Sequence, residues 1–293
     1  MSARSLASMA RGAAAALLLV GCLPGDTRPP PAVIHFTVEP SPAVTEGVTT
    51  EDGWHIVFEK LLVSIGGAGV DNDGAGCTRY ANAGYDRLFD FTVPGRQKLS
   101  DVYALGTCDL RFRLRSPGSD ALLGEGVSAQ DLDFMRVEDQ DSAGLTGRKT
   151  VHLRGRATRE AVTKRFEWSF RVGYRLSECA GAEMGMASRV LLRGGEELPL
   201  PLIIHGEELF RATASDASPL RFDTFADADA DADQTITLEE LYNAPSPAPD
   251  VDGGLGLGSV DGAAPPFTMF LYYVLLPRMA RLGDSGACRS ESQ

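Results

Sequence analysis

The 293-residue sequence is poor in histidine, and it lacks the spaced motifs of common catalytic and metal sites. It has four histidines, and none has a partner at the H-x-x-H or H-E-x-x-H spacing of a helical zinc site. A G-x-S-x-G nucleophile turn, a P-loop and a G-x-G-x-x-G turn after a strand are missing as well. These absences argue against an enzyme. The alternative is an active site whose residues are distant in the sequence and are brought together only by the fold. The histidines are His35, His55, His152 and His205.

Long apolar runs and C-x-x-C pairs are absent too. The apolar stretches at 13–20 and 267–282 are too short to cross a bilayer, which takes about 20 residues. Without C-x-x-C spacing, a thiolate metal site has no support. Basic residues are outnumbered, 28 against 40 acidic residues, for a net charge of −12. This acidity disfavours nucleic acid and anionic lipid as partners.

The body of the chain reads as mainly β. Hydrophobic residues make up 43% of the sequence and aromatic residues 8%, enough to build a core. Over residues 33–213 the apolar residues mostly alternate with polar ones, and Gly, Pro, Asn and Asp clusters separate the alternating runs. This pattern predicts an antiparallel β-sandwich, with Trp54 and Trp168 in its core. The clearest runs are 33–38, 54–59, 109–114, 150–155 and 165–174.

Four other segments interrupt or follow this pattern. Residues 66–76 predict a flexible turn with an acidic tip, and the acidic segment 131–141 predicts surface charge, with a short helix or a weak cation patch as alternatives. Residues 244–266 are rich in Gly, Pro and Ala, which is typical of a linker. Residues 267–293 predict a helix that docks on the body, kinked or divided at Pro277, followed by a tail.

The N-terminus is typical of an exported chain. Residues 1–21 have the basic start and short apolar stretch of a signal peptide, and their removal takes away Arg4 and Arg11, leaving 26 basic against 40 acidic residues, or −14. The segment Leu-Val-Gly-Cys that ends at Cys22 resembles the lipobox of bacterial lipoproteins. An ordinary signal peptide with an incidental cysteine is the alternative.

The lipobox resemblance implies a cellular location for the mature chain. It implies that Cys22 is lipidated and becomes the mature N-terminus, and that the chain is held in the membrane by this lipid anchor. Leu23 follows the cysteine where an inner-membrane retention signal would show Asp, so the resemblance implies an outer-membrane lipoprotein of the cell envelope. Residues 22–32 are rich in proline and predict an extended tether.

Four cysteines remain in the mature body, which is an even number for an exported chain. They predict two disulfides, for which three pairings exist. We expect Cys77–Cys108 and Cys179–Cys288, the second of which would fasten the C-terminus to the body.

Residues 229–240, D-A-D-A-D-Q-T-I-T-L-E-E, carry the clearest ligand spacing in the chain. Acidic residues occupy positions 1, 3, 5 and 12, which resembles the calcium loop of an EF-hand. Three carboxylates two residues apart converge in a tight loop, and Ca²⁺ takes six to eight oxygens at roughly 2.3–2.6 Å. The expected ligands are Asp229, Asp231, Asp233, the Thr235 carbonyl, Thr237 directly or through water, and Glu240.

The flanks of this loop predict an EF-hand-like helix–loop–helix over 214–243. Ile236 at position 8 should be buried, and Ser218 should cap an incoming helix that starts at Pro219. Position 6 is normally Gly because the backbone turns there with φ > 0, and here it is Gln234, at a cost of about 1–2 kcal/mol. The outgoing helix stops early at Pro245. We therefore expect a weak, structural calcium site.

Two alternatives accompany the calcium prediction. The Asp-Ala repeat also occurs in solvated acidic loops. A second, paired hand would have to begin at Asp250 and end at Asp261, but its Gly-rich middle has no ligand at position 5, so a linker is the better interpretation.

A family resemblance adds one functional alternative. The segments 54–65, 88–91 and 108–114 look like strands of exported bacterial β-sandwich lipoproteins, including the methanobactin-associated copper-binding type. The stretch 204–210, Ile-His-Gly-Glu-Glu-Leu-Phe, resembles a histidine-containing stretch of such proteins, with Glu208 where a second histidine would stand. The resemblance implies a transition-metal-handling protein of the envelope. The main expectation is a calcium-stabilised binding or scaffold module whose protein or small-ligand partner is unknown, and a hydrolase would need an acidic cleft that no spacing reveals.

Overall fold

A computed structural model describes residues 29–71, 76–82, 84–141, 144–179, 189–244, 266–283, 286 and 288–293. Chain contacts separate Met1–Pro30 from a compact body, Pro31–Gln293. The expected signal peptide, Cys22, most of the tether and all but the ends of the 244–266 linker lie outside the described residues, as does the second hand at 250–261. Within the described residues no helix is both long and apolar enough to pass through a membrane.

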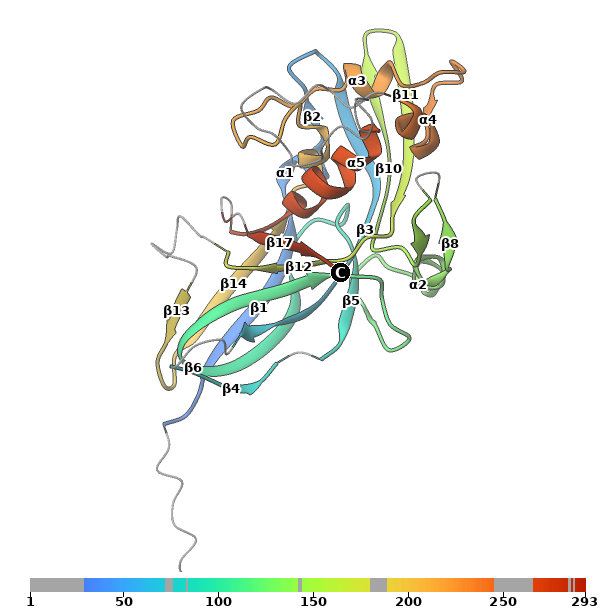
Figure 1. Cartoon of the computed structure of the whole chain (residues 1–293). Coiled ribbons are helices and arrows are strands. Elements are labelled where there is room, and N and C mark those ends of the chain that lie inside the picture. The colour runs from blue at the N-terminus through green and yellow to red at the C-terminus, as the bar shows by residue number, and fades with distance from the viewer. Residues whose placement is uncertain are drawn as a thin grey trace, which may run out of the picture. The chain divides into compact units, whose positions relative to one another are not determined.

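The body is mainly β, as the alternation predicts (Figure 1). Each expected run lies within or overlaps a strand. The strands are β1 (Ala32–Pro40), β2 (Val48–Thr49), β3 (His55–Asp71), β4 (Cys77–Ala81), β5 (Asp86–Asp90), β6 (Gln97–Leu114), β7 (Leu122–Leu123), β8 (Asp139–Gln140), β9 (Thr146–Gly147), β10 (Val151–Arg159), β11 (Val162–Phe170), β12 (Tyr174–Ser177), β13 (Arg189–Leu192), β14 (Glu197–Ile204), β15 (Thr235–Ile236), β16 (Ala280–Leu282) and β17 (Arg289–Ser292).

All but β8 and β9 join one curled sheet, whose main path runs β15-β11-β10-β3-β6-β1-β14-β16. The long strands β3 and β6 pair with each other, and their register shifts between Gly66 and Gly69. A second shift lies between Arg154 and Gly155, where β10 meets β3. Such bulges bend a strand and increase its twist, which accounts for the curl.

The expectation of a purely antiparallel sandwich is wrong at three places, because the sheet is mixed. Strand β1 pairs in parallel with β14, β5 with β7, and β11 with β15. Alternation of apolar and polar residues is the same for both strand directions, so the sequence pattern does not reveal these pairs. The expected turn at 66–76 is also partly wrong, since Gly66 to Asp71 continue β3 and pair with β5 and β6.

Short helical segments complete the body. They are α1 (Pro42–Glu46), α2 (Ala129–Arg136), η2 (Gly206–Phe210), α3 (Asp223–Ala226), α4 (Leu238–Asn243), α5 (Phe267–Phe270), η3 (Leu271–Leu275) and η4 (Leu276–Met279). The last three are contiguous and correspond to the predicted C-terminal helix, which docks on the body through buried residues such as Phe267, Leu271 and Leu275. The helical turns end at Met279, two residues after Pro277. The prediction of a helix up to residue 282 is therefore wrong for residues 280–282. Ala280–Leu282 pair with β14, and the expected tail forms β17.

An aromatic core lies between the sheet and the segments that follow β14. Trp54 and Trp168 are buried in it, as predicted. Phe210 contacts Phe166, Trp168 and Phe222, with ring centroids 5.5, 6.0 and 5.7 Å away. Phe225 continues the cluster to Phe267, 4.7 Å away. This core holds α3 and α5 against the sheet, and α4 contacts both α5 and β11.

Both expected disulfides are present. Cys77 is bonded to Cys108 and Cys179 to Cys288. The first joins β4 to β6, and the second fastens the residue before β17 to the end of β12.

Candidate metal centre

The segment 214–243 folds around the predicted loop, but its incoming helix is shorter than expected. Helix α3 has four residues, Asp223–Ala226, and Ser218 is not its cap. The Ser218 hydroxyl instead accepts a hydrogen bond from the Thr213 N–H at 2.8 Å and closes a turn. The chain between 218 and 222 is held by the bridge between Arg211 and Leu220, so a helix cannot begin there.

Three of the predicted ligands come together. The carboxylates of Asp229, Asp231 and Asp233 offer oxygen atoms that all lie within 4.8 Å of one another. Asp231 and Asp233 are exposed, whereas the side chain of Asp229 is fully buried. Its Oδ1 atom has no hydrogen-bond partner among the described residues. A buried carboxylate oxygen without a donor is costly, so this atom is suited to a bound cation.

The backbone of the loop turns where the spacing predicts. Gln234 has φ 71°, in the left-handed region that position 6 requires. Its N–H donates to Asp229 Oδ2 at 3.1 Å, the Asp233 N–H donates to Asp231 Oδ1 at 3.1 Å, and the Thr235 N–H donates to Asp233 Oδ1 at 2.6 Å. These short-range bonds fold the loop around its own carboxylates.

The outgoing half of the loop is fixed to the edge of the sheet. Thr235–Ile236 form β15, which pairs in parallel with Arg165 and Phe166 of β11. The Arg165 N–H donates to the Gln234 carbonyl at 2.7 Å, and Trp168 Nε1 donates to the Ile236 carbonyl at 2.8 Å. Ile236 is fully buried, as predicted. Because successive carbonyls of an extended strand face opposite ways and the Gln234 carbonyl accepts from β11, the Thr235 carbonyl faces away from β11.

Glu240 and Thr237 have a different role from the three aspartates. Glu240 Oε2 accepts hydrogen bonds from the N–H and the hydroxyl of Thr237, both at 2.8 Å, in a capping box at the start of α4. Glu240 Oε1 accepts a hydrogen bond from the Ala230 N–H at 3.0 Å, so the side chain contacts the backbone at the start of the loop. It is not part of the group within 4.8 Å. A ligand role for Glu240 would require this carboxylate to turn towards the aspartates.

Lys164 of β11 also belongs to this site, although the sequence did not predict it. Its Nζ bonds Asp229 Oδ2, and its side chain is only 16% exposed. Burial of the Asp229 carboxylate opposes its ionisation, but the Lys164 ammonium and the N–H groups of Gln234 and Asp233 outweigh that effect and hold the pKa of Asp229 below its usual value. Lys164 lies 65 residues from Asp229, in a strand whose alternation does not distinguish it from a surface lysine.

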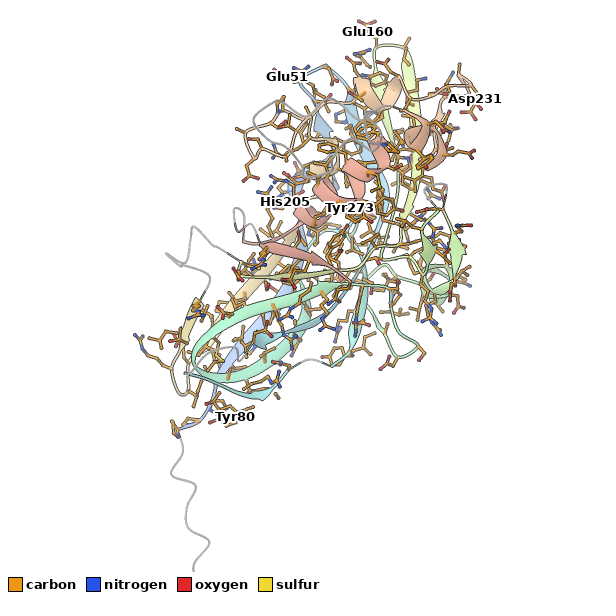
Figure 2. The ribbon with its side chains drawn as sticks, in the orientation of Figure 1. Glu51, Tyr80, Glu160, His205, Asp231 and Tyr273 are labelled. Carbon is orange, nitrogen blue, oxygen red and sulfur yellow. A yellow bond between two sulfur atoms is a disulfide. The ribbon has the colours of Figure 1, made fainter. Side chains whose placement is uncertain are left out.

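No histidine of the described residues lies in a group of three or more His, Cys, Asp or Glu side chains close enough to hold a metal. His35 bonds Asp101 at 2.8 Å, His152 bonds Ser169 at 2.9 Å and His205 bonds Glu207 at 2.9 Å, each through Nδ1. Figure 2 shows His205 in a different part of the body from Asp231. Among the described residues, the three aspartates are the single group of three or more His, Cys, Asp or Glu close enough to hold a metal. That group contains no histidine, and the copper-type alternative stays a prediction.

The acidic segment 131–141 includes part of the short helix α2, which confirms the short-helix alternative for 131–136. Asp131 caps α2 together with Ser128 and pairs with Lys60 at 3.1 Å. Asp139 pairs with Lys149 at 2.8 Å and with Arg171. These two carboxylates have cationic partners, which supports the prediction of surface charge for this segment.

Comparison with known families, curated proteins and solved structures found no match. The proposals below therefore depend on the residues and geometry of this chain.

Proposed function

We propose that residues 229–240 bind one Ca²⁺, and that the ion locks α3 and α4 onto the sheet edge of a lipid-anchored envelope protein. The observation that carries this proposal is the buried Asp229 Oδ1 atom, which lacks a hydrogen-bond partner and lies beside two further carboxylates. A divalent cation would satisfy that oxygen and relieve the repulsion among the three aspartates.

Calcium is the metal that fits this donor set best. The loop offers carboxylate, carbonyl and hydroxyl oxygens, which hard cations prefer, and no thiolate or imidazole. Lys164 supplies one positive charge against four acidic side chains, Glu240 included. Mg²⁺ demands a near-ideal octahedron and dehydrates reluctantly, so a flexible loop of this kind should prefer Ca²⁺.

The position of the loop favours a structural role. On one side Phe225 packs in the aromatic core, and on the other Ile236 is buried and paired with β11. An ion held between them would join α3, β15 and α4 into one unit. The lipobox resemblance at Cys22 supports an extracytoplasmic location, where a site of micromolar to millimolar affinity is useful. The protein would serve there as a binding or scaffold module.

Thermal unfolding of the chain from residue 23 tests the calcium proposal, since the body from Pro31 onward is a compact unit by itself. Free Ca²⁺ at 100 times Kd adds about 2.7 kcal/mol of stability, which for a body of this size is a rise in Tm of about 5–10 °C over EDTA. Asp231→Asn should remove most of this rise. The matched control, Asp133→Asn, changes an equally exposed aspartate outside the loop and should keep it. An identical Tm in millimolar Ca²⁺ and in EDTA would contradict the proposal.

A further inference from the structure

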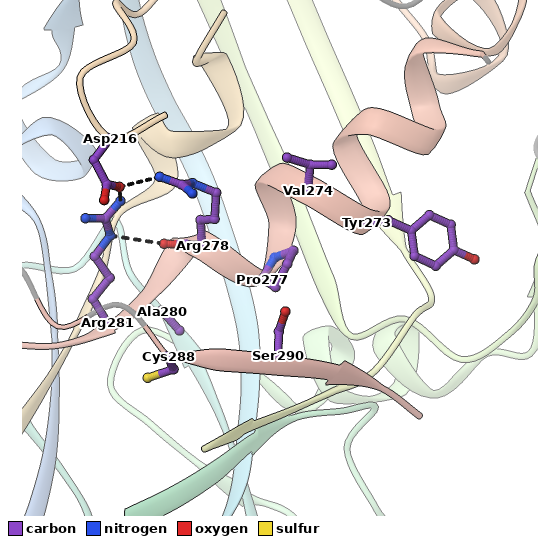
Figure 3. A pocket seen from close by; sticks show the side chains of 9 residues that line it. All are labelled: Asp216, Tyr273, Val274, Pro277, Arg278, Ala280, Arg281, Cys288 and Ser290. Atoms are coloured by element: carbon purple, nitrogen blue, oxygen red, sulfur yellow. Dashed lines mark hydrogen bonds and ion pairs between the residues drawn. The ribbon is translucent and has the colours of Figure 1, made fainter. Parts of the chain in front are cut away.

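A cavity of about 270 Å³ lies beside the C-terminal helical segment (Figure 3), and none of its lining residues belongs to the loop 229–240. One end is charged, with Arg278, Arg281 and Asp216 in its lining. Val274, Pro277 and Ala280 supply an apolar wall, and the β17 residue Ser290 lies opposite Pro277. The volume is close to the lower end of the range for small-molecule sites, about 300 Å³.

The charged end holds more positive than negative groups in direct contact. Arg211 bonds both oxygens of the buried Glu208, at 2.7 and 2.6 Å. Arg281 Nη2 then meets Glu208 Oε2 at 2.9 Å and Asp216 Oδ1 at 3.0 Å. Arg278 also bonds Asp216 Oδ1. Three guanidinium groups thus share two carboxylates, and this excess of positive charge lies in a chain whose net charge is −12.

The arginines are built into the fold, whereas their exposed partner is not. The Arg281 side chain is 10% exposed, and its Nε donates to the Arg278 carbonyl at 3.4 Å. Arg278 Nε is buried and has no hydrogen-bond partner among the described residues, and it lies 3.7 Å from Glu208 Oε2. The Asp216 side chain is 64% exposed and extends from a surface turn. Because Asp216 is itself mostly exposed, its carboxylate would be hydrated on leaving, and a ligand carboxylate would replace it as the partner of the arginines.

We infer that this cavity binds a small carboxylate that carries an apolar or aromatic group. The carboxylate would lie between Arg278 and Arg281, where the Asp216 carboxylate now lies, and Asp216 acts as an internal substitute for it. Planar guanidinium groups match a carboxylate with paired hydrogen bonds. The apolar wall favours a ligand with an apolar portion over inorganic phosphate. This site shares no residue with 229–240, so it stands independently of the calcium proposal.

Isothermal titration of the chain from residue 23 with benzoate tests the inference, with inorganic phosphate and neutral benzamide as comparison probes. We expect benzoate to bind at millimolar Kd or better, and both comparison probes to bind at least about tenfold more weakly, because each lacks either the apolar group or the charge. Asp216→Asn should tighten benzoate binding about fivefold or more, since it removes the competing carboxylate. Arg278→Gln should weaken it about tenfold, the value of one charge-assisted hydrogen bond.

The matched control is Arg289→Gln, which changes an exposed arginine of β17 that pairs with Glu178 outside the cavity lining and should leave benzoate binding unchanged. Absence of benzoate binding in both the wild type and Asp216→Asn would overturn the inference. Phosphate binding as strong as benzoate binding would overturn the ligand class. Equal benzoate affinity in Arg278→Gln and wild type would overturn the role of the arginines; if Arg278→Gln fails to fold, the Asp216→Asn comparison decides.

Discussion

At the scale of single residues, His152 is a buried group whose ionisation the fold opposes. It is 6% exposed, and its ring contacts Phe134 with centroids 4.7 Å apart. Burial, followed by repulsion from Arg154, Lys149 and Lys60, lowers the pKa of His152 from 6.5 to about 4, against a smaller opposing effect of Asp131. Glu167 Oε1 lies 3.8 Å from Nε2 on the exposed side. The neutral imidazole is therefore the folded form.

This lowered pKa predicts a loss of stability in acid. The unfolded chain binds a proton at His152 below pH 6.5 and the folded chain only below about pH 4, so the stabilisation is complete above pH 6.5 and is lost as pH falls towards 4. The free energy of unfolding should fall by up to about 3 kcal/mol over this window on account of His152. Urea unfolding between pH 4 and 7.5 measures this fall in the free energy of unfolding. The fall should be smaller in His152→Gln than in the wild type, and the same as in the wild type in the exposed His55→Gln. Equal slopes in His152→Gln and wild type would show that this group does not cause the dependence.

Lys164 should have a distinct, testable effect on the proposed calcium site. Its ammonium bonds the one buried aspartate of the loop, so an incoming ion must compete with it. Lys164→Met should tighten Ca²⁺ binding about fivefold or more, because two unit charges 4 Å apart repel by about 1 kcal/mol even in bulk water. It should also lower Tm in EDTA, since Asp229 loses its cationic partner. Calorimetric titration gives the affinity, and Lys98→Met, at a lysine that is 61% exposed, is the control. Unchanged affinity in Lys164→Met would mean that the lysine does not compete.

At the scale of elements, the C-terminal strand is held by few interactions. The four residues of β17 are exposed, the strand pairs only with β12 among the described strands, and the Cys179–Cys288 disulfide precedes it. This bond closes a loop of 109 residues, compared with 31 for Cys77–Cys108. Loop-closure entropy grows with loop length, so the longer loop should be the more stabilising one.

Replacing Cys179 and Cys288 together by Ser should destabilise the body by about 2–5 kcal/mol and free β17. Hydrogen exchange should show lost protection of the amides of 289–292, while β1 and β10 keep theirs. As the matched control, Cys77 and Cys108 are replaced together by Ser. In the chain-entropy model this loss of stability should be about 1 kcal/mol smaller than that of the first replacement, and the β17 amides should stay protected. Protection of β17 that survives the first replacement would show that its pairing with β12 suffices.

At the scale of the whole molecule, the proposed lipid anchor decides where the body works. Cys22→Ser should release the protein from the membrane fraction and abolish labelling by a fatty-acid analogue, because a cysteine sulfur is the acylated group in the lipobox resemblance. Leu23→Asp should keep the label and shift the protein to the inner membrane. A Cys22→Ser protein that is still labelled and membrane-bound would contradict the anchor.

Much of the body could be predicted from sequence because its signals are local. Alternation in runs such as 150–155 places Val151 and Leu153 in the core, and both are fully buried. The spacing of Asp229, Asp231 and Asp233 is enough to bring their oxygens together, since the loop folds on its own hydrogen bonds. The left-handed backbone at Gln234 follows from the same spacing.

The remaining features depend on residues that are distant in the chain. The parallel pairing of β1 with β14 is set by topology, which alternation does not encode. The expected helix start at Ser218 fails because Arg211 and Leu220 form a bridge, and this tertiary contact outweighs a local capping preference. The cluster of Arg278, Arg281, Glu208 and Asp216 likewise joins separate segments and has no sequence spacing of its own.

The sequence by itself determined the β-rich body and the convergence of three loop carboxylates, because strand alternation and a twelve-residue loop act over short stretches of chain. Only the tertiary structure decided what surrounds those carboxylates. It buried Asp229, placed Lys164 against it and fastened Ile236 to β11, because side-chain burial and long-range ion pairs depend on which strands become neighbours. The loop predicted from spacing is thus part of the sheet edge, and a bound ion would act on the stability of the whole body.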